Sequence, residues 1–110
     1  MLTAANPIAS DPALNQALTR SYNNWVADIS GQTPNRLKWV TVIDVHDPKE
    51  AAQEMERTHE MGSVGVMVLG DYSTKSLDHE DFTPIWDTAN QLGMPINVHP
   101  GTGALDAAKA

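Results

Sequence analysis

The chain has 110 residues, enough for one small domain over residues 1–110, and its 41% hydrophobic and 19% charged residues are typical of a globular protein. A formal net charge of -7 argues against nucleic acid and anionic membrane surfaces as partners, because an acidic surface repels phosphate groups. No apolar run in the sequence is long enough to cross a bilayer. The absence of cysteine excludes disulfides and thiolate metal sites, and we expect a cytoplasmic protein.

The first predicted element is a helix over residues 11–29. Asp11 can cap its amino terminus, and Pro12 fits its first turn. Its apolar residues recur every three or four positions, as on one face of a helix. We expect Trp25 of this face, like Trp39 and Trp86 further along, to lie in the core. The residues of the apolar face are Leu14, Ala17, Leu18, Tyr22, Trp25, Val26 and Ile29.

A strand and a second helix follow. The run LKWVTVIDV, residues 37–45, is β-branched and has the length of a strand. Asp47 then caps a helix, with Pro48 in its first turn and Glu50 in position to complete a capping box. Gly62 marks the end of that helix.

The second half of the chain repeats the alternation. SVGVMVLG, residues 63–70, is an apolar strand, and a polar loop separates it from a third helix. Thr83 and Pro84 start that helix, and Gly93 stops it. The last strand, MPINVH, ends at His99, where proline and glycine break the chain.

Helices that alternate with strands predict parallel strands joined by crossover helices. The carboxyl ends of all three strands then form one rim, where α/β proteins place their functional residues. His99 ends the third strand on this rim. Taken alone, a single strand-end histidine is more often a rim residue than a ligand. His46 and Asp47, after the first strand, could in principle add ligands, but Asp47 is better explained as the helix cap and His46 as a loop residue.

The segment from Asp47 to Pro100 resembles the amidohydrolase-2 family of metal-dependent hydrolases and decarboxylases, which includes aminocarboxymuconate-semialdehyde decarboxylase and γ-resorcylate decarboxylase. The matching residues are the DP helix start, EMER, GSVGVMV, LDHEDFTPIWDTA and PINVHP. ALTRSYNNWVADIS and NRLKWVTV resemble the part of the family before its third strand.

The resemblance implies that the chain corresponds to about strands three to five of a (β/α)8 barrel. It makes His99 a ligand of a divalent metal, zinc or manganese, and places Pro100, Gly101 and Thr102 beside a small carboxylated or cyclic substrate. The metal would serve hydrolysis or non-oxidative decarboxylation. The His-x-His or Glu-x-His pair of the family's first strand is absent from the sequence, as are the later histidine and aspartate.

Two hypotheses follow. In the first, the chain is a segment of a metal-dependent amidohydrolase, inactive by itself. In the second, it is a non-catalytic α/β interaction module that associates with itself, because three parallel strands leave two open sheet edges. On either hypothesis we expect a homo-oligomer that forms through those edges.

Overall fold

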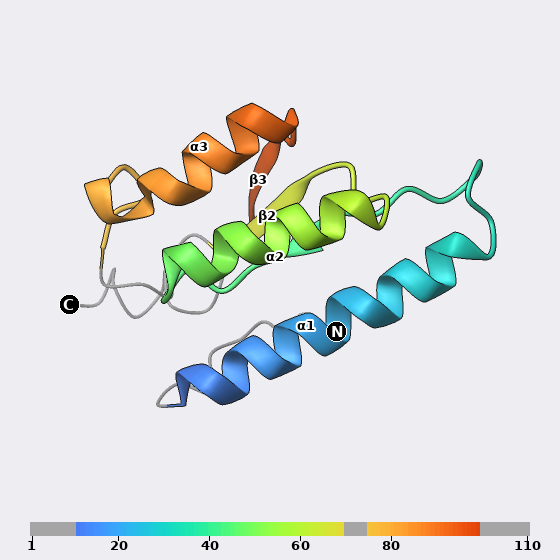
Figure 1. Cartoon of the computed structure of the whole chain (residues 1–110), viewed down its shortest axis with the longest axis horizontal. Coiled ribbons are helices and arrows are strands. Elements are labelled where there is room, and N and C mark those ends of the chain that lie inside the picture. The colour runs from blue at the N-terminus through green and yellow to red at the C-terminus, as the bar shows by residue number, and fades with distance from the viewer. Residues whose placement is uncertain (1–10, 70–74, 100–110) are drawn as a thin grey trace.

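The computed structural model describes residues 11–69 and 75–99, which alternate between helices and strands. Figure 1 shows α2 between α1 and α3, with the strands behind α2. None of the described helices is long and apolar enough to cross a membrane. The elements are α1 (Pro12–Gly31), β1 (Thr41–Val42), α2 (Pro48–Glu60), β2 (Val66–Leu69), the 3-10 turn η2 (Glu80–Phe82), α3 (Thr83–Leu92) and β3 (Ile96–His99).

The helices begin and end where the predicted capping residues lie. An Asp11 carboxylate oxygen accepts a hydrogen bond from the Leu14 amide at 3.1 Å, and Asp47 accepts one from the Glu50 amide at 3.2 Å. Each satisfies an amide that the first turn of a helix leaves without a partner. Gly93 ends α3 with a φ of 67°, a left-handed conformation that glycine adopts without strain. The predicted helices are confirmed.

The strands form one parallel sheet in the order β1-β2-β3. Val42 of β1 is opposite Met67 of β2, and Leu69 of β2 is opposite His99 of β3. The predicted fold, three parallel strands with crossover helices, is confirmed. The first strand is shorter than predicted, since only Thr41–Val42 of residues 37–45 form a ladder. The residues that flank β1 and β2 are connected by single hydrogen bonds, such as the one that the Val64 amide donates to the Trp39 carbonyl.

The main core lies between the sheet and the pair α2 and α3. Val66 and Val68 of β2 point into it, and Met55 of α2 is fully buried there. The residues after β1 contribute Ile43 and Val45 to the same cluster. This core holds the sheet and two helices as one unit and thereby fixes the ends of β2 and β3. Its other buried members are Ala51, Phe82, Ile85, Ala89 and Met94.

Three hydroxyl groups connect β1 to α2 beneath this core. Thr41 Oγ1 lies 2.5 Å from Thr58 Oγ1 and 2.7 Å from Ser63 Oγ, and all three residues are buried. Ser63 also donates to the Gly65 carbonyl at 2.9 Å. Buried hydroxyl groups are costly unless they are hydrogen-bonded, and here each has a partner.

α1 packs against the rest of the chain through polar residues. Its buried side chains are those of Asn15, Thr19, Asn23 and Ser30. Asn23 is fully buried and contacts β1, because its amide donates to the Val42 carbonyl and accepts from the Val42 amide, both at 2.9 Å. The Asn23 amide also donates to Glu54 of α2 at 2.8 Å. These hydrogen bonds attach α1 to the sheet edge.

The apolar face of α1 is largely exposed, contrary to the prediction that its tryptophan lies in the core. Trp25 is 53% exposed, and Leu14 and Ile29 are also exposed. Trp86 of α3 is exposed too, with its indole N–H donating to the Leu77 carbonyl at 3.0 Å. Only Trp39 is buried as predicted. The apolar periodicity predicts the helix and its stripe, but the neighbour that covers the stripe does not follow from it.

Candidate functional site

His99 lies at the carboxyl end of the sheet. It is the last residue of β3, it is half-buried, and it is opposite Leu69 at the end of β2. Because the strands are parallel, the chain that leaves β1 toward Asp44 and His46 starts from the same end of the sheet. The predicted rim is therefore present for β1 and β3. Residues 70–74, which follow β2, and the predicted substrate-binding residues Pro100, Gly101 and Thr102 lie outside the described residues.

His46 is oriented by a neighbouring carboxylate. Asp44 is buried, and its Oδ1 accepts a hydrogen bond from the His46 amide at 3.0 Å and lies 2.7 Å from His46 Nδ1. Such a contact at one ring nitrogen fixes the plane of an imidazole. Asp47 is the cap of α2, so its carboxylate serves the helix.

A complete metal site is not formed by the residues that the structure describes. A catalytic metal of this type needs about three protein ligands and an open position. Within residues 11–69 and 75–99, no three histidine or acidic side chains lie close enough together to hold an ion. His99 alone offers one imidazole, so this chain's described donor set does not fit a bound metal without further ligands.

The remaining histidines have other surroundings. His79 precedes η2, and its Nδ1 accepts a hydrogen bond from the Asp81 amide at 3.1 Å. His59 is exposed on α2, away from the carboxyl end of the sheet. Neither belongs to a group of three or more described side chains that could hold a metal ion.

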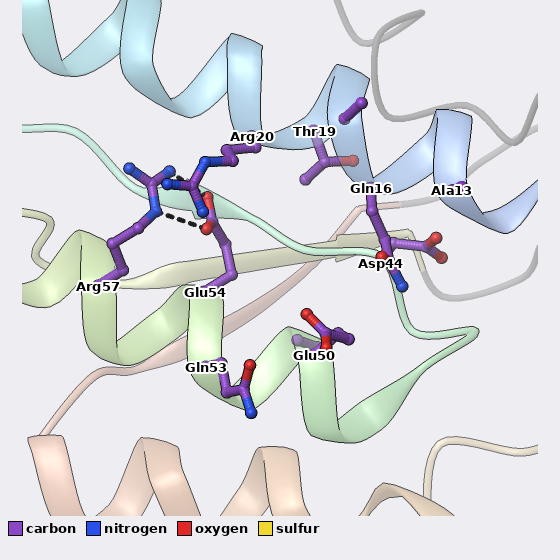
Figure 2. Close-up of a pocket in the computed structure, with 11 residues that line it drawn as sticks. Ala13, Gln16, Thr19, Arg20, Asp44, Glu50, Gln53, Glu54 and Arg57 are labelled. Atoms are coloured by element: carbon purple, nitrogen blue, oxygen red, sulfur yellow. Dashed lines mark hydrogen bonds and ion pairs between the residues drawn. The ribbon is translucent and has the colours of Figure 1, made fainter.

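A polar hollow of about 470 Å³ lies between α1 and α2, with Asp44 in its wall. Figure 2 shows Arg20 of α1 pointing toward Glu54 and Arg57, which form an ion pair on α2 at 2.6 Å. The hydrogen bond that the Arg57 guanidinium donates to Glu54 raises the pKa of Arg57 above its ordinary value. The charged groups that line the hollow are three carboxylates, of Asp44, Glu50 and Glu54, and two guanidinium groups, of Arg20 and Arg57. Charges of both signs therefore line it.

The sequence analysis missed the residue that links α1 to this region. Asn23 contacts both β1 and Glu54, yet its position in an otherwise amphipathic helix gave no reason to single it out. One signal was available in the spacing, because Asn15, Thr19 and Asn23 recur every four residues and so mark a polar face. That face is the one that α1 buries.

The comparisons with known proteins agree with this architecture. A family model described as amidohydrolase matches residues 2–109. γ-Resorcylate decarboxylase from Polaromonas sp. is 31% identical over 104 residues, which are 88% of this chain and 32% of that enzyme. 2-Amino-3-carboxymuconate-6-semialdehyde decarboxylase from Dictyostelium discoideum is 24% identical over 84 residues, 76% of this chain and 23% of that enzyme.

Solved structures match as well. A dihydroxybenzoic acid decarboxylase from Polaromonas sp., with bound manganese and the inhibitor 2-nitroresorcinol, has a TM-score of 0.80 and 27% identity, covering 92% of this chain and 32% of its own. A 5-carboxyvanillate decarboxylase from Novosphingobium aromaticivorans, complexed with manganese, has a TM-score of 0.82 and 25% identity over 91% and 31% of the two chains.

These structural relatives are (β/α)8-barrel enzymes, so the predicted barrel segment is confirmed. The chain spans about a third of the length of the relatives it matches. Both the sequence and the structural matches favour a segment of a metal-dependent enzyme over a separate interaction module. The chain belongs to the amidohydrolase family.

Proposed function

We propose that this chain is the part of a decarboxylase barrel that supplies one ligand, His99, to a divalent metal. The observation that carries the proposal is the position of His99 at the carboxyl end of β3, in a chain whose family and relatives are matched over nearly its whole length. Ligands bind at that end of parallel strands in α/β barrels. His99 is the described residue that combines this position with an imidazole.

Decarboxylation is the favoured reaction, and manganese is the favoured metal. The named relatives are decarboxylases, and two solved relatives hold manganese. The substrate class that their names indicate is a small carboxylated compound, in most cases a hydroxylated benzoate. Pro100, Gly101 and Thr102 follow the proposed ligand directly in sequence, and we propose that they border the substrate.

The chain by itself should not turn over substrate. The described residues bring no three histidine or acidic side chains together, whereas a catalytic metal needs about three ligands, so metal binding and chemistry require residues from outside them. His46, whose Nδ1 lies 2.7 Å from Asp44, is a candidate for a second nitrogen ligand. We propose His99 as the principal ligand because the resemblance assigns the family's metal histidine to the HP pair that it begins.

The experiment is a graft. This chain replaces the matched third of the Polaromonas γ-resorcylate decarboxylase, and carbon dioxide release from γ-resorcylate is measured with manganese. We expect turnover by the graft, none by the 110-residue chain alone, and a loss of about a hundredfold or more in the His99→Ala graft. His59→Ala, which removes an exposed imidazole on α2, is the matched control and should leave turnover unchanged. Full activity in the His99→Ala graft would overturn the proposal.

A further inference from the structure

The polar hollow between α1 and α2 has no role in the proposed function. Its volume of about 470 Å³ falls within the range of roughly 300–1,000 Å³ that small-molecule sites occupy. Side chains of α1 form one wall and side chains of α2 the other, and Asp44 lies at one end (Figure 2). Clefts between helices are common places for ligands. We refer to this cavity as the α1–α2 hollow.

Two of the charged groups in the hollow serve the fold. Glu54 accepts hydrogen bonds from Arg57 Nε at 2.7 Å and from Arg57 Nη2 at 2.6 Å, so both of its oxygens are engaged. Arg57 also donates to Asn24 of α1 at 2.8 Å, which ties the two helices together. A ligand would have to compete with these bonds to use either group, so neither is the main contact for one.

Arg20 of α1 and Glu50 of α2 differ from this pair. Among residues 11–69 and 75–99, neither side chain is joined to another by a hydrogen bond or an ion pair. Both are exposed, and both line the hollow. A single exposed charge is explained by its contact with water. Here two charges of opposite sign face the same cavity from different helices, an arrangement that suits a ligand with two charges.

The two ends of the hollow differ in charge. Figure 2 shows Arg20 beside the pair of Glu54 and Arg57 at one end, and Glu50 with Asp44 toward the other. The first end holds two guanidinium groups and one carboxylate, whereas the second holds two carboxylates. Glu50 and Glu54 are four residues apart on α2, which separates them by about 6 Å along the helix axis. The hollow is therefore positive at one end and negative at the other.

The rest of the lining can hold the body of a small polar molecule. Gln16 of α1 and Gln53 of α2 each present a side-chain amide, which can donate to a ligand and accept from it. Ala17 and Ala51 face the same cavity, and their small side chains leave room for methylene groups. The lining thus combines charged ends with space for a short aliphatic chain.

We propose that the α1–α2 hollow binds a small zwitterion, an ω-amino carboxylate whose carboxylate contacts Arg20 and whose ammonium group contacts Glu50. A guanidinium can bind a carboxylate through two parallel N–H bonds, and an ammonium group donates to a carboxylate. The substrates that the relatives' names indicate are carboxylated compounds, in most cases hydroxylated benzoates. A hydroxylated benzoate has no ammonium group, so the inferred ligand belongs to another chemical class.

This inference goes beyond the proposed function and does not depend on it. His99 is not among the residues that line the hollow, and β2 separates its strand from β1. The 5-carboxyvanillate decarboxylase aligns with 91% of this chain, so most of α1 and α2 belongs to the shared fold. The walls of the hollow therefore need neither the metal nor the remaining two thirds of a barrel.

The experiment compares three probes that differ only in charge. The 110-residue chain is titrated with 5-aminopentanoate, with pentanoate and with 1-aminopentane at equal ionic strength, by calorimetry and by amide NMR shifts. The zwitterion should bind about tenfold more tightly than either singly charged probe, because one charged contact is lost with each of those. Its shifts should map to residues 16–20 and 50–54, which line the hollow.

Two variants assign the ends of the ligand. Arg20→Gln should weaken binding of 5-aminopentanoate about tenfold, to the affinity of 1-aminopentane, and Glu50→Gln should weaken it to that of pentanoate. Both residues are exposed, so each variant should keep its fold, which circular dichroism checks. The matched controls are Arg36→Gln and Glu56→Gln, which remove the same charges from exposed positions outside the hollow and should leave binding unchanged.

Several results would overturn the inference: no binding of the zwitterion, equal affinity for the three probes, shifts that map away from the hollow, or equal losses in the control variants. His99→Ala should bind 5-aminopentanoate as the unaltered chain does. A graft that fails to bind manganese would therefore refute His99 as a ligand and leave the α1–α2 hollow standing. Loss of zwitterion binding in Arg36→Gln would refute the hollow and leave the role of His99 untouched.

Discussion

The two sides of this molecule use the same local signals and bury opposite kinds of residue. α1 and α2 both begin with aspartate and proline, and both are amphipathic. α2 turns Met55 into an apolar core with β2, whereas α1 turns Asn23 inward and leaves Trp25 exposed. Capping and periodicity therefore specify a helix, and the elements around it decide which face is buried. α2 and α3 share a buried apolar cluster with the sheet, whereas α1 contributes no side chain to that cluster.

The largest loss of stability is expected from a substitution in the core between the sheet, α2 and α3. Met55→Ala removes a fully buried side chain between α2 and the sheet, and it should lower the free energy of unfolding by about 2–5 kcal/mol because a cavity remains. Met61→Ala, at the exposed end of α2, is the matched control and should cost much less. Urea unfolding of both variants measures the difference. Equal losses would mean that the α2 core is not the stable part of the chain.

The second largest loss of stability is expected where Asn23 attaches α1 to β1. Asn23→Ala removes two buried hydrogen bonds and one partly buried one, and leaves the Val42 amide and carbonyl without their Asn23 partner, which should cost about 1–3 kcal/mol. Asn24→Ala, one residue away, removes an exposed bond to Arg57 and should change stability by about 0.5 kcal/mol or less. Hydrogen exchange at the Val42 amide would show whether the loss is local to β1.

The exposed apolar side chains of α1 should contribute little to the stability of the 110-residue chain. Trp25→Ala removes a side chain that is more than half exposed and touches Tyr22 at a ring separation of 6.0 Å, so we expect a change of about 1 kcal/mol or less. The measurement is thermal unfolding of the 110-residue chain. A loss as large as that of Met55→Ala would show that α1 already buries Trp25 in solution.

The smallest effect concerns pH. The hydrogen bond from Lys75 lowers the pKa of Asp81 below its ordinary value of 3.8. A carboxylate whose pKa is lower in the folded state stabilises the fold above its unfolded pKa, and this contribution is lost as the pH falls through the folded value. Both groups are exposed, so the effect on stability should be slight. In Lys75→Met, NMR titration should show the Asp81 pKa returning toward 3.8, and an unchanged value would exclude Lys75 as the cause.

The parts of the fold that could be predicted are those that neighbouring residues determine. Asp11 and Asp47 cap helices through amides three residues away, and Gly93 ends one through its own backbone. The length of β1 and the exposure of Trp25 depend on contacts with residues that are distant in the sequence, and the prediction failed for both. A periodic stripe carries no information about which neighbour covers it.

In the candidate site, too, the sequence predicted some features and not others. The place of His99 at a strand end followed from strand order and direction, and the structure confirms that place. Its role as a ligand came only from resemblance, since a single imidazole in the sequence does not define a metal site. The contact between Asp44 and His46, and that between Asn23 and β1, depend on side-chain geometry that no spacing rule specified.

The most direct measurement of the central claim is the manganese content of the graft, by elemental mass spectrometry, with His99 and with His99→Ala. The account predicts nearly one manganese per chain with His99, a large loss in His99→Ala, and no loss in His59→Ala. Equal manganese in the His99 and His99→Ala grafts would contradict the claim that this chain supplies a metal ligand to an amidohydrolase barrel.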